Sequence, residues 1–232
     1  MLAANALGFA REQYLRAAVS HDPAKGVPRS TAPDGRWRTV GIHDWTSGFF
    51  AGVLWRLAEH AGDTTLRAEA ARWTLPLTAI TGGQYDHDLG FQYNTSFGNG
   101  LRVTGDPRFH ASLLDAARHL AGRYDQRVGM IRSWSWGAWQ YPVIIDNMMN
   151  LELLLWGART GGDTSWARIA RDHADRTLRD HVREGGGTFH VVDYDTTTGA
   201  VVRRMTWQGY ADSSTWARGQ AWATYGFTMM HR

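Results

Sequence analysis

The chain has 232 residues, 43% hydrophobic and 20% charged, a composition that favours a globular protein with a sizeable core. Its 25 Lys and Arg are scattered rather than gathered in a run, which argues against nucleic acid as a partner. The absence of cysteine excludes disulfides and a cysteine nucleophile. No stretch approaches the length of a membrane span and no signal peptide is visible, so we expect a cytoplasmic protein, or a periplasmic or secreted one if a leader was removed.

Helical periodicity and helix start and stop signals predict a largely helical chain. The predicted helices, in chain order, cover 3–19, 45–61, 64–80, 88–104, 107–124, 144–160, 163–182 and 213–231. Between the last two, alternating β-branched residues around a Thr-Gly turn predict a β-hairpin near 187–206. Short connectors with Gly followed by Asp or Thr join the helices, so we expect an array of helical hairpins forming a single domain, 1–232.

The second, fourth, sixth and eighth helices begin in unusual stretches, at 43–50, 85–98, 145–150 and 214–222. Alternate helices of an up-and-down array run parallel, so these four N-termini are expected to share one face. Helix N-termini favour anions, which predicts a site for a ligand that carries a carboxylate.

Two acids, Asp88 and Asp146, belong to this expected site. The chain has 12 Trp, more than a core needs, and indoles commonly stack on sugar rings. Paired carboxylates beside indoles are typical of enzymes that break glycosidic linkages, because burial raises the pKa of one acid while the other stays ionised. The alternative is that both acids only cap helices. For Asp146 we expect both roles, N-cap and proton donor. The indoles near the two acids are expected to be Trp45, Trp134, Trp136, Trp139, Trp216 and Trp222.

Other polar residues near these helix starts carry weaker predictions. Asp44 and Asp86 are interpreted as capping or supporting residues. Adjacent residues of the 86–88 cluster point apart and lack a fourth ligand, so we expect no metal and no other cofactor. Arg218, between two tryptophans, is a plausible clamp for a carboxylate, and a lone His190 is more often structural.

Three ordered motifs carry a resemblance to a known family. They are HDLGF at 87–91, IDNMMNL at 145–151 and WARGQAW at 216–222. With them the chain resembles the unsaturated glucuronyl hydrolases of glycoside hydrolase family 88, from about residue 10 to the last residue. The related unsaturated rhamnogalacturonyl hydrolases share the fold and the acidic pair, but their motifs fit less well.

The resemblance implies an all-α fold, an (α/α)6 barrel of helical hairpins. The predicted helices amount to about eight of the twelve that such a barrel needs, so we expect an incomplete barrel whose C-terminal part is missing, with the β-hairpin near 187–206 as an insertion.

The resemblance also implies the chemistry. The substrate would be a 4,5-unsaturated glucuronic acid at the non-reducing end of oligosaccharides released by lyases, hydrolysed by hydration of its vinyl ether. Asp146 would protonate C4 and help water to add at C5, and Asp88 would bind hydroxyls and set the protonation of the site. No metal would be required. By matched position, the substrate would be bound or enclosed by His87, Trp45, Phe49, Trp134, His190, Gln208, Trp216, Arg218 and Trp222.

Three alternatives remain open at this point. One is an unsaturated rhamnogalacturonyl hydrolase, and another is a carbohydrate-binding helical module without turnover. The third is a sugar epimerase or isomerase, which would need a pair of histidines as proton shuttles, and only His87 and His190 are available for that role. Neither nucleic acid nor a membrane is expected as a partner.

Overall fold

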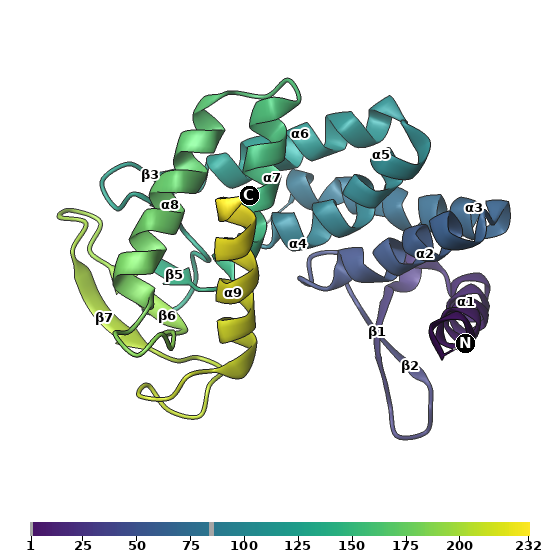
Figure 1. Cartoon of the computed structure of the whole chain (residues 1–232), viewed down its shortest axis with the longest axis horizontal. Helices are drawn as coiled ribbons and strands as arrows, with labels where there is room; N and C mark the ends of the chain where they lie inside the picture. The colour runs from purple at the N-terminus through teal and green to yellow at the C-terminus, as the bar shows by residue number, and fades with distance from the viewer. Residues whose placement is uncertain (1, 84–85) are drawn as a thin grey trace. The chain divides into compact units, whose positions relative to one another are not determined.

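The computed structural model describes residues 2–83 and 86–232. The chain forms two compact units, one of residues 1–85 and 91–115 and the other of residues 86–90 and 116–232 (Figure 1). Tyr85, which opens the predicted stretch 85–98, lies outside the described residues.

The first unit combines helices with a two-stranded antiparallel hairpin. Helices α2 and α3 pack against each other, and α1 packs against both. A 3-10 helix, Leu75–Gly82, follows α3. The other elements in order are α1 (Leu2–Ser20), β1 (Val27–Thr31), β2 (Trp37–Val40), α2 (Ser47–Ala61) and α3 (Thr64–Thr74).

The predicted fourth helix is one rod in three parts. It consists of α4 (Leu89–Tyr93), a π-helical turn (Asn94–Gly98) and α5 (Asn99–Thr104). Helix α6 (Pro107–Ala121) follows, and the boundary between the two units passes through α4 and α6. Asp88 therefore precedes α4 in the second unit.

The second unit contains a three-stranded antiparallel sheet and three long helices. In the sheet, β6 lies between β5 and β7, and Val191 of β6 is paired with Ile144 and Met205. The remaining strands, β3 and β4, form a separate short antiparallel pair. The elements are β3 (Tyr124–Asp125), β4 (Met130–Ile131), β5 (Pro142–Ile144), α7 (Asn147–Arg159), α8 (Ser165–His181), β6 (Val191–Tyr194), β7 (Val201–Met205) and α9 (Ala217–His231).

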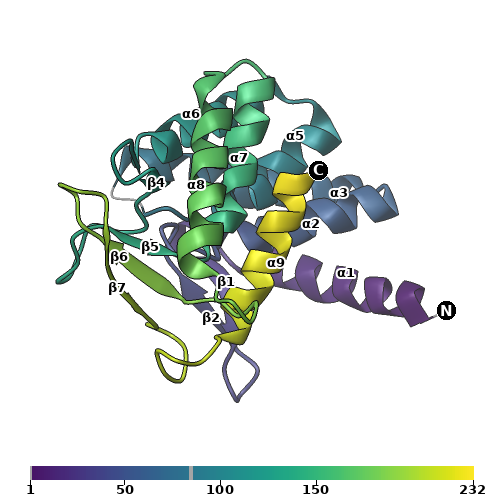
Figure 2. The ribbon, with the colours of Figure 1, turned by 60° about the vertical axis from the view of Figure 1, so that its left-hand side comes forward.

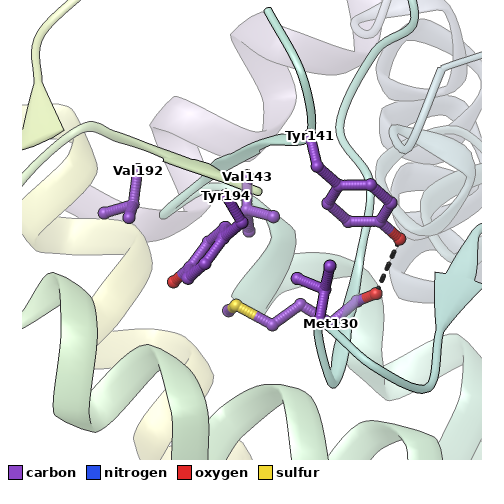
Figure 3. Packing of buried hydrophobic residues seen from close by; sticks show 6 residues of the cluster. Met130, Tyr141, Val143, Val192 and Tyr194 are labelled. Carbon is purple, nitrogen blue, oxygen red and sulfur yellow. Dashed lines mark hydrogen bonds between the residues drawn. The ribbon is translucent and has the colours of Figure 1, made fainter. Parts of the chain in front are cut away.

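The sheet contributes to a buried apolar cluster in the second unit (Figure 3). Its strand residues Val143 and Val192 are fully buried, and so is Met130. The hydroxyl of Tyr141 lies 2.9 Å from the Met130 carbonyl oxygen, to which it donates, so the polar end of this ring is satisfied inside the core. The packed sheet gives the loop before α7 a fixed position.

Helix α7 is the central helix of the second unit, packed against both α8 and α9 (Figures 1 and 2). Two glycines allow α9 and α4 to approach α7 closely. A Cβ on Gly226 of α9 would lie 2.4 Å from the Met148 Cβ, and one on Gly90 of α4 would lie 2.4 Å from the Asn150 Cα. Side chains at these two positions would push α9 and α4 away from the first turns of α7, where Asp146 lies.

The predicted helices and the hairpin near 187–206 are confirmed, with errors at several boundaries. The predicted helix 144–160 begins at Asn147, because residues 142–144 pair with β6 as a strand. The predicted helix 213–231 begins at Ala217, because Asp212 accepts the Thr206 N–H (2.8 Å) and holds the preceding residues as a loop. The hairpin of β1 and β2 was not predicted. Within the described ranges, no helix has the length and apolar character needed to cross a bilayer.

Candidate active site

Asp146 directly precedes α7 and is buried, with 7% of its surface exposed. Its backbone is already helical (φ −59°, ψ −26°), and its side chain makes no capping hydrogen bond to the first turn, all of which is described. A capping side chain normally reaches those N–H groups from an extended backbone. The expectation that Asp146 caps the helix is therefore wrong.

Burial first, and then the nearby charge of Asp88, raise the pKa of the Asp146 carboxyl, which lies at about 7. The charge of Arg218, the indole of Trp222 and a backbone hydrogen bond act in the opposite direction and only partly offset the rise. A carboxyl with a pKa near 7 is protonated in a large fraction of molecules at neutral pH. It can therefore serve as a general acid.

His190 faces Asp146 in a defined tautomer. Its Nδ1 accepts the backbone N–H groups of Trp207 (3.1 Å) and Gln208 (3.2 Å), so Nδ1 carries no proton and the neutral ring carries its proton on Nε2. This Nε2 lies 3.7 Å from Oδ2 of Asp146. Neither atom has a hydrogen-bond partner among the described residues. Catalytic hydrogen bonds are often this long before substrate binds, and a shift of about 1 Å would form one.

His87 and Asp88 repeat this arrangement. The Asn150 amide donates to His87 Nδ1 (3.2 Å), and His87 Nε2 lies 3.5 Å from Oδ1 of Asp88. Burial lowers the pKa of His87 to about 3, and of His190 to about 4, so both rings are neutral at pH 7. Each carboxyl group therefore faces the N–H of a neutral imidazole.

The start of α9 brings an aromatic ring and a cation to His190. The rings of Trp216 and His190 lie 4.4 Å apart, and the Arg218 guanidinium lies 4.3 Å from the centre of the Trp216 ring. The exposed Arg218 also donates to the side chain of Gln208. The positive charge of Arg218 lowers the pKa of both Asp146 and His190, so its electrostatic effect extends to the acid. An anionic group bound beside Asp146 would meet that charge.

The remaining expected residues fall into two groups. Trp134 belongs to the second unit and is 6% exposed. Trp45 and Phe49 belong to the first unit, where the Trp45 ring packs edge-on against Phe49 and Phe91 at 5.8 and 5.4 Å. Their contact with a substrate stays a prediction.

Sequence reasoning missed the residues that hold the two acid segments in place. The buried Asn147 donates to the Ile131 carbonyl (2.9 Å) and to Ser133 Oγ (3.1 Å). The Ser133 carbonyl accepts the His87 N–H (3.1 Å), which joins the Asp88 segment to the start of α7. In the sequence Asn147 stands out only as the neighbour of Asp146, so its residue type alone gave little indication of this role.

The supporting acids behave differently from each other. Asp44 accepts the Thr46 N–H at 2.9 Å in the turn before α2, whereas the N-cap position itself is Thr46 and has no side-chain capping bond, so Asp44 supports this turn and does not cap the helix. Asp86 is exposed, and its role stays a prediction. Among the described residues, no group of three or more His, Cys, Asp or Glu side chains is arranged to hold a metal ion.

Comparison with known proteins finds relatives that are hydrolases of unsaturated saccharides. An unsaturated glucuronyl hydrolase of Formosa agariphila is 44% identical over 196 residues, which cover 83% of this chain and 49% of the relative. An unsaturated chondroitin disaccharide hydrolase of Streptococcus agalactiae is 33% identical, over 84% of this chain and 50% of the relative. The chain thus spans about half the length of the curated relatives it matches. No protein-family model matches it.

Solved structures agree with this result. A crystal structure of an unsaturated glucuronyl hydrolase specific for heparin superimposes with a TM-score of 0.93 at 45% identity, covering 98% of this chain and 61% of that one. The resemblance predicted from the three motifs is confirmed, and so is the (α/α)6-barrel fold class.

Proposed function

We propose that this chain carries the catalytic residues of an unsaturated glucuronyl hydrolase, an enzyme that removes 4,5-unsaturated glucuronic acid from the non-reducing end of oligosaccharides. The observation that supports this most is the buried carboxyl of Asp146, whose pKa lies near 7 because of burial and the neighbouring Asp88. One matching solved structure is an unsaturated glucuronyl hydrolase specific for heparin, and one matching relative is an unsaturated chondroitin disaccharide hydrolase.

The first step uses the proton of Asp146. The substrate has a C4=C5 double bond whose C5 also carries the ring oxygen, so the bond is a vinyl ether. Transfer of the Asp146 proton to C4 leaves a positive charge shared between C5 and the ring oxygen. The Asp146 carboxyl becomes a carboxylate and can then act as a base.

The second step adds water. Asp146 removes a proton from a water molecule as its oxygen bonds to C5, which gives a hemiketal and restores the protonated acid. The hemiketal opens to a ketone at C5, and the hemiacetal left at C1 releases the alcohol of the next sugar. One water is consumed, and no bond to the protein forms.

The neutral histidines fit this cycle. The Nε2–H of His190 would donate to Oδ2 of Asp146, which leaves the acid proton on Oδ1, and it would stabilise the carboxylate formed after proton transfer. His87 would hold Asp88 in the same way, with Asp88 placed to bind sugar hydroxyls.

The substrate carboxylate would be bound beside α9. Arg218 supplies a positive charge whose effect reaches Asp146, and Gln208 is hydrogen bonded to it. Trp216 and Trp222 would pack against the sugar, and Trp45, Phe49 and Trp134 would enclose it. We also propose that both units belong to a single catalytic domain, which the match of one solved structure to 98% of the chain supports.

A single assay tests the proposed activity. Hydration destroys the ultraviolet absorbance of an unsaturated uronyl disaccharide, so we expect wild-type protein to abolish this absorbance, with and without a chelator. Asp146→Asn should lower kcat by at least about 100-fold. A preference for galacturonosyl over glucuronosyl disaccharides would favour the rhamnogalacturonyl alternative. Binding without loss of absorbance, for this chain and for a version extended to the length of its relatives, would contradict the proposal.

A further inference from the structure

Four tryptophans of the second unit form a continuous cluster, named here the tryptophan cluster: Trp134, Trp136, Trp139 and Trp207. The rings of Trp134 and Trp136 are stacked at 5.0 Å with an angle of 16° between their planes. Trp207 meets Trp136 at 6.1 Å and Trp139 at 6.2 Å, in both cases edge to face. Two segments distant in sequence, 134–139 and 207, therefore build one aromatic surface.

Both segments are attached to the residues that hold the two acids. Ser133, directly before Trp134, accepts the backbone N–H of His87 and the amide of Asn147. The backbone N–H of Trp207 donates to the ring of His190. The tryptophan cluster is thus connected on one side to the Asp88 segment and on the other to the partner of Asp146.

The cluster is buried at one end and open at the other. Trp134 is 6% exposed, whereas Trp136 is 49% and Trp207 58% exposed. The buried ring of Trp134 is explained by its contribution to the stability of the loop. A structural role does not explain why the indoles of Trp136 and Trp207 keep about half of their surface exposed to water, which is unfavourable for apolar groups. Exposed indole faces beside a sugar site are typical of surfaces on which pyranose rings stack.

We infer that Trp136 and Trp207 form a binding surface for the sugar rings that follow the terminal unsaturated uronate, so that longer oligosaccharides bind more tightly than disaccharides. This inference rests on the proposed function, because it assigns the next sugars of the same substrate. Trp139, although it belongs to the tryptophan cluster, is not part of this binding surface. The guanidinium of Arg203 lies 4.3 Å from the centre of its ring and is held by Asp193 at 3.4 Å.

The test compares chain lengths. We would measure kcat/KM for an unsaturated disaccharide and for a tetrasaccharide of the same repeat, in wild type, Trp136→Ala and Trp207→Ala. The wild type should prefer the tetrasaccharide, and each variant should reduce that preference by roughly fivefold to tenfold, the effect of one lost stacking contact. Trp136→Phe, which keeps an aromatic face, should lose less. Tyr210→Ala is the matched control, because Tyr210 is 99% exposed and lies outside the cluster.

A binding measurement separates this inference from the proposed function. In the Asp146→Asn background, calorimetry should show tighter binding of the tetrasaccharide than of the disaccharide, with the difference reduced by Trp136→Ala. If wild-type protein showed no turnover but this binding pattern held, the activity would fail and the binding surface would stand. Equal affinity for both lengths in the parent, or an unchanged length preference in two tryptophan variants that melt like wild type, would overturn the inference.

Discussion

His87 and His190 place the same chemical group against two different acids. In each, Nδ1 accepts a hydrogen bond and Nε2 faces a carboxyl oxygen, at 3.5 Å for Asp88 and 3.7 Å for Asp146. The sequence assigned both histidines to the site only through the family resemblance, His87 within a motif and His190 outside the three motifs. Their tautomers could not be predicted, because the donors to Nδ1 are brought in by the fold: Asn150 for His87, and the backbone at 207–208 for His190.

Replacing His190 tests whether the Nε2–H group that faces Asp146 contributes to turnover. His190→Leu removes the N–H that faces Asp146, and we expect kcat to fall by about 10- to 100-fold, which corresponds to about 1–3 kcal/mol for a lost buried hydrogen bond. His190→Gln retains an N–H donor and should recover part of the rate. Steady-state kinetics on the unsaturated disaccharide would measure both. Equal loss in the two variants would mean that the N–H itself has no role.

The raised pKa of Asp146 predicts the pH profile of turnover. The acid must be protonated to start the reaction, so kcat/KM should be level below about pH 7 and decline by about tenfold per pH unit above it. Besides burial, the negative charge of Asp88 contributes to the raised pKa, so Asp88→Asn, which removes that charge, should move the decline to lower pH. A profile that rises through pH 7 would contradict a protonated donor.

At the scale of elements, the long periodic helices were predicted well and the short strands poorly. Strand β5 has three residues and exists because it pairs with β6, about 50 positions later, so local pattern favoured the helix that follows it. The predicted capping role of Asp146 failed for a related reason. The turn after β5 brings the residue into helical conformation before α7 begins.

Packing around α7 can be tested with one glycine. In Gly226→Ala the new methyl would lie 2.4 Å from the Met148 Cβ, so α9 must shift, and we expect the free energy of unfolding to fall by about 1–3 kcal/mol. Gly8→Ala is the matched control. Gly8 lies within α1 with no atom near its added Cβ, and this change should raise stability by about 0.5–1 kcal/mol. Urea denaturation would compare them, and equal effects would contradict the close approach.

For the whole molecule, the buried histidines predict acid sensitivity. Burial lowers the pKa of His87 and His173 to about 3, and that of His181 and His190 to about 4. Between about pH 4 and 6.5 the unfolded chain binds more protons on these rings than the folded chain does, so their contribution to stability is lost as pH falls through that window. Urea denaturation should therefore give a lower free energy of unfolding at pH 5 than at pH 7.

The raised pKa of Asp146 has the opposite effect on the pH dependence of stability. Its pKa is raised in the folded state, so between about pH 4 and 7 the folded chain keeps a proton that the unfolded chain releases, and its contribution to stability declines as pH rises. Asp146→Asn removes this opposing effect. The loss of stability from pH 7 to pH 5 should become larger in the variant, by about 2 kcal/mol. A smaller loss than in wild type would show that Asp146 is not protonated in the folded protein.

The central claim is that Asp146 donates a proton to C4 of the substrate, and following that proton into the product tests it most directly. In D2O, transfer from Asp146 should place a single deuterium on one face of C4 of the released sugar, visible by nuclear magnetic resonance, and Asp146→Asn should abolish this product. A released sugar that still contains the C4=C5 double bond, or deuterium spread equally over both faces of C4, would contradict proton donation by Asp146.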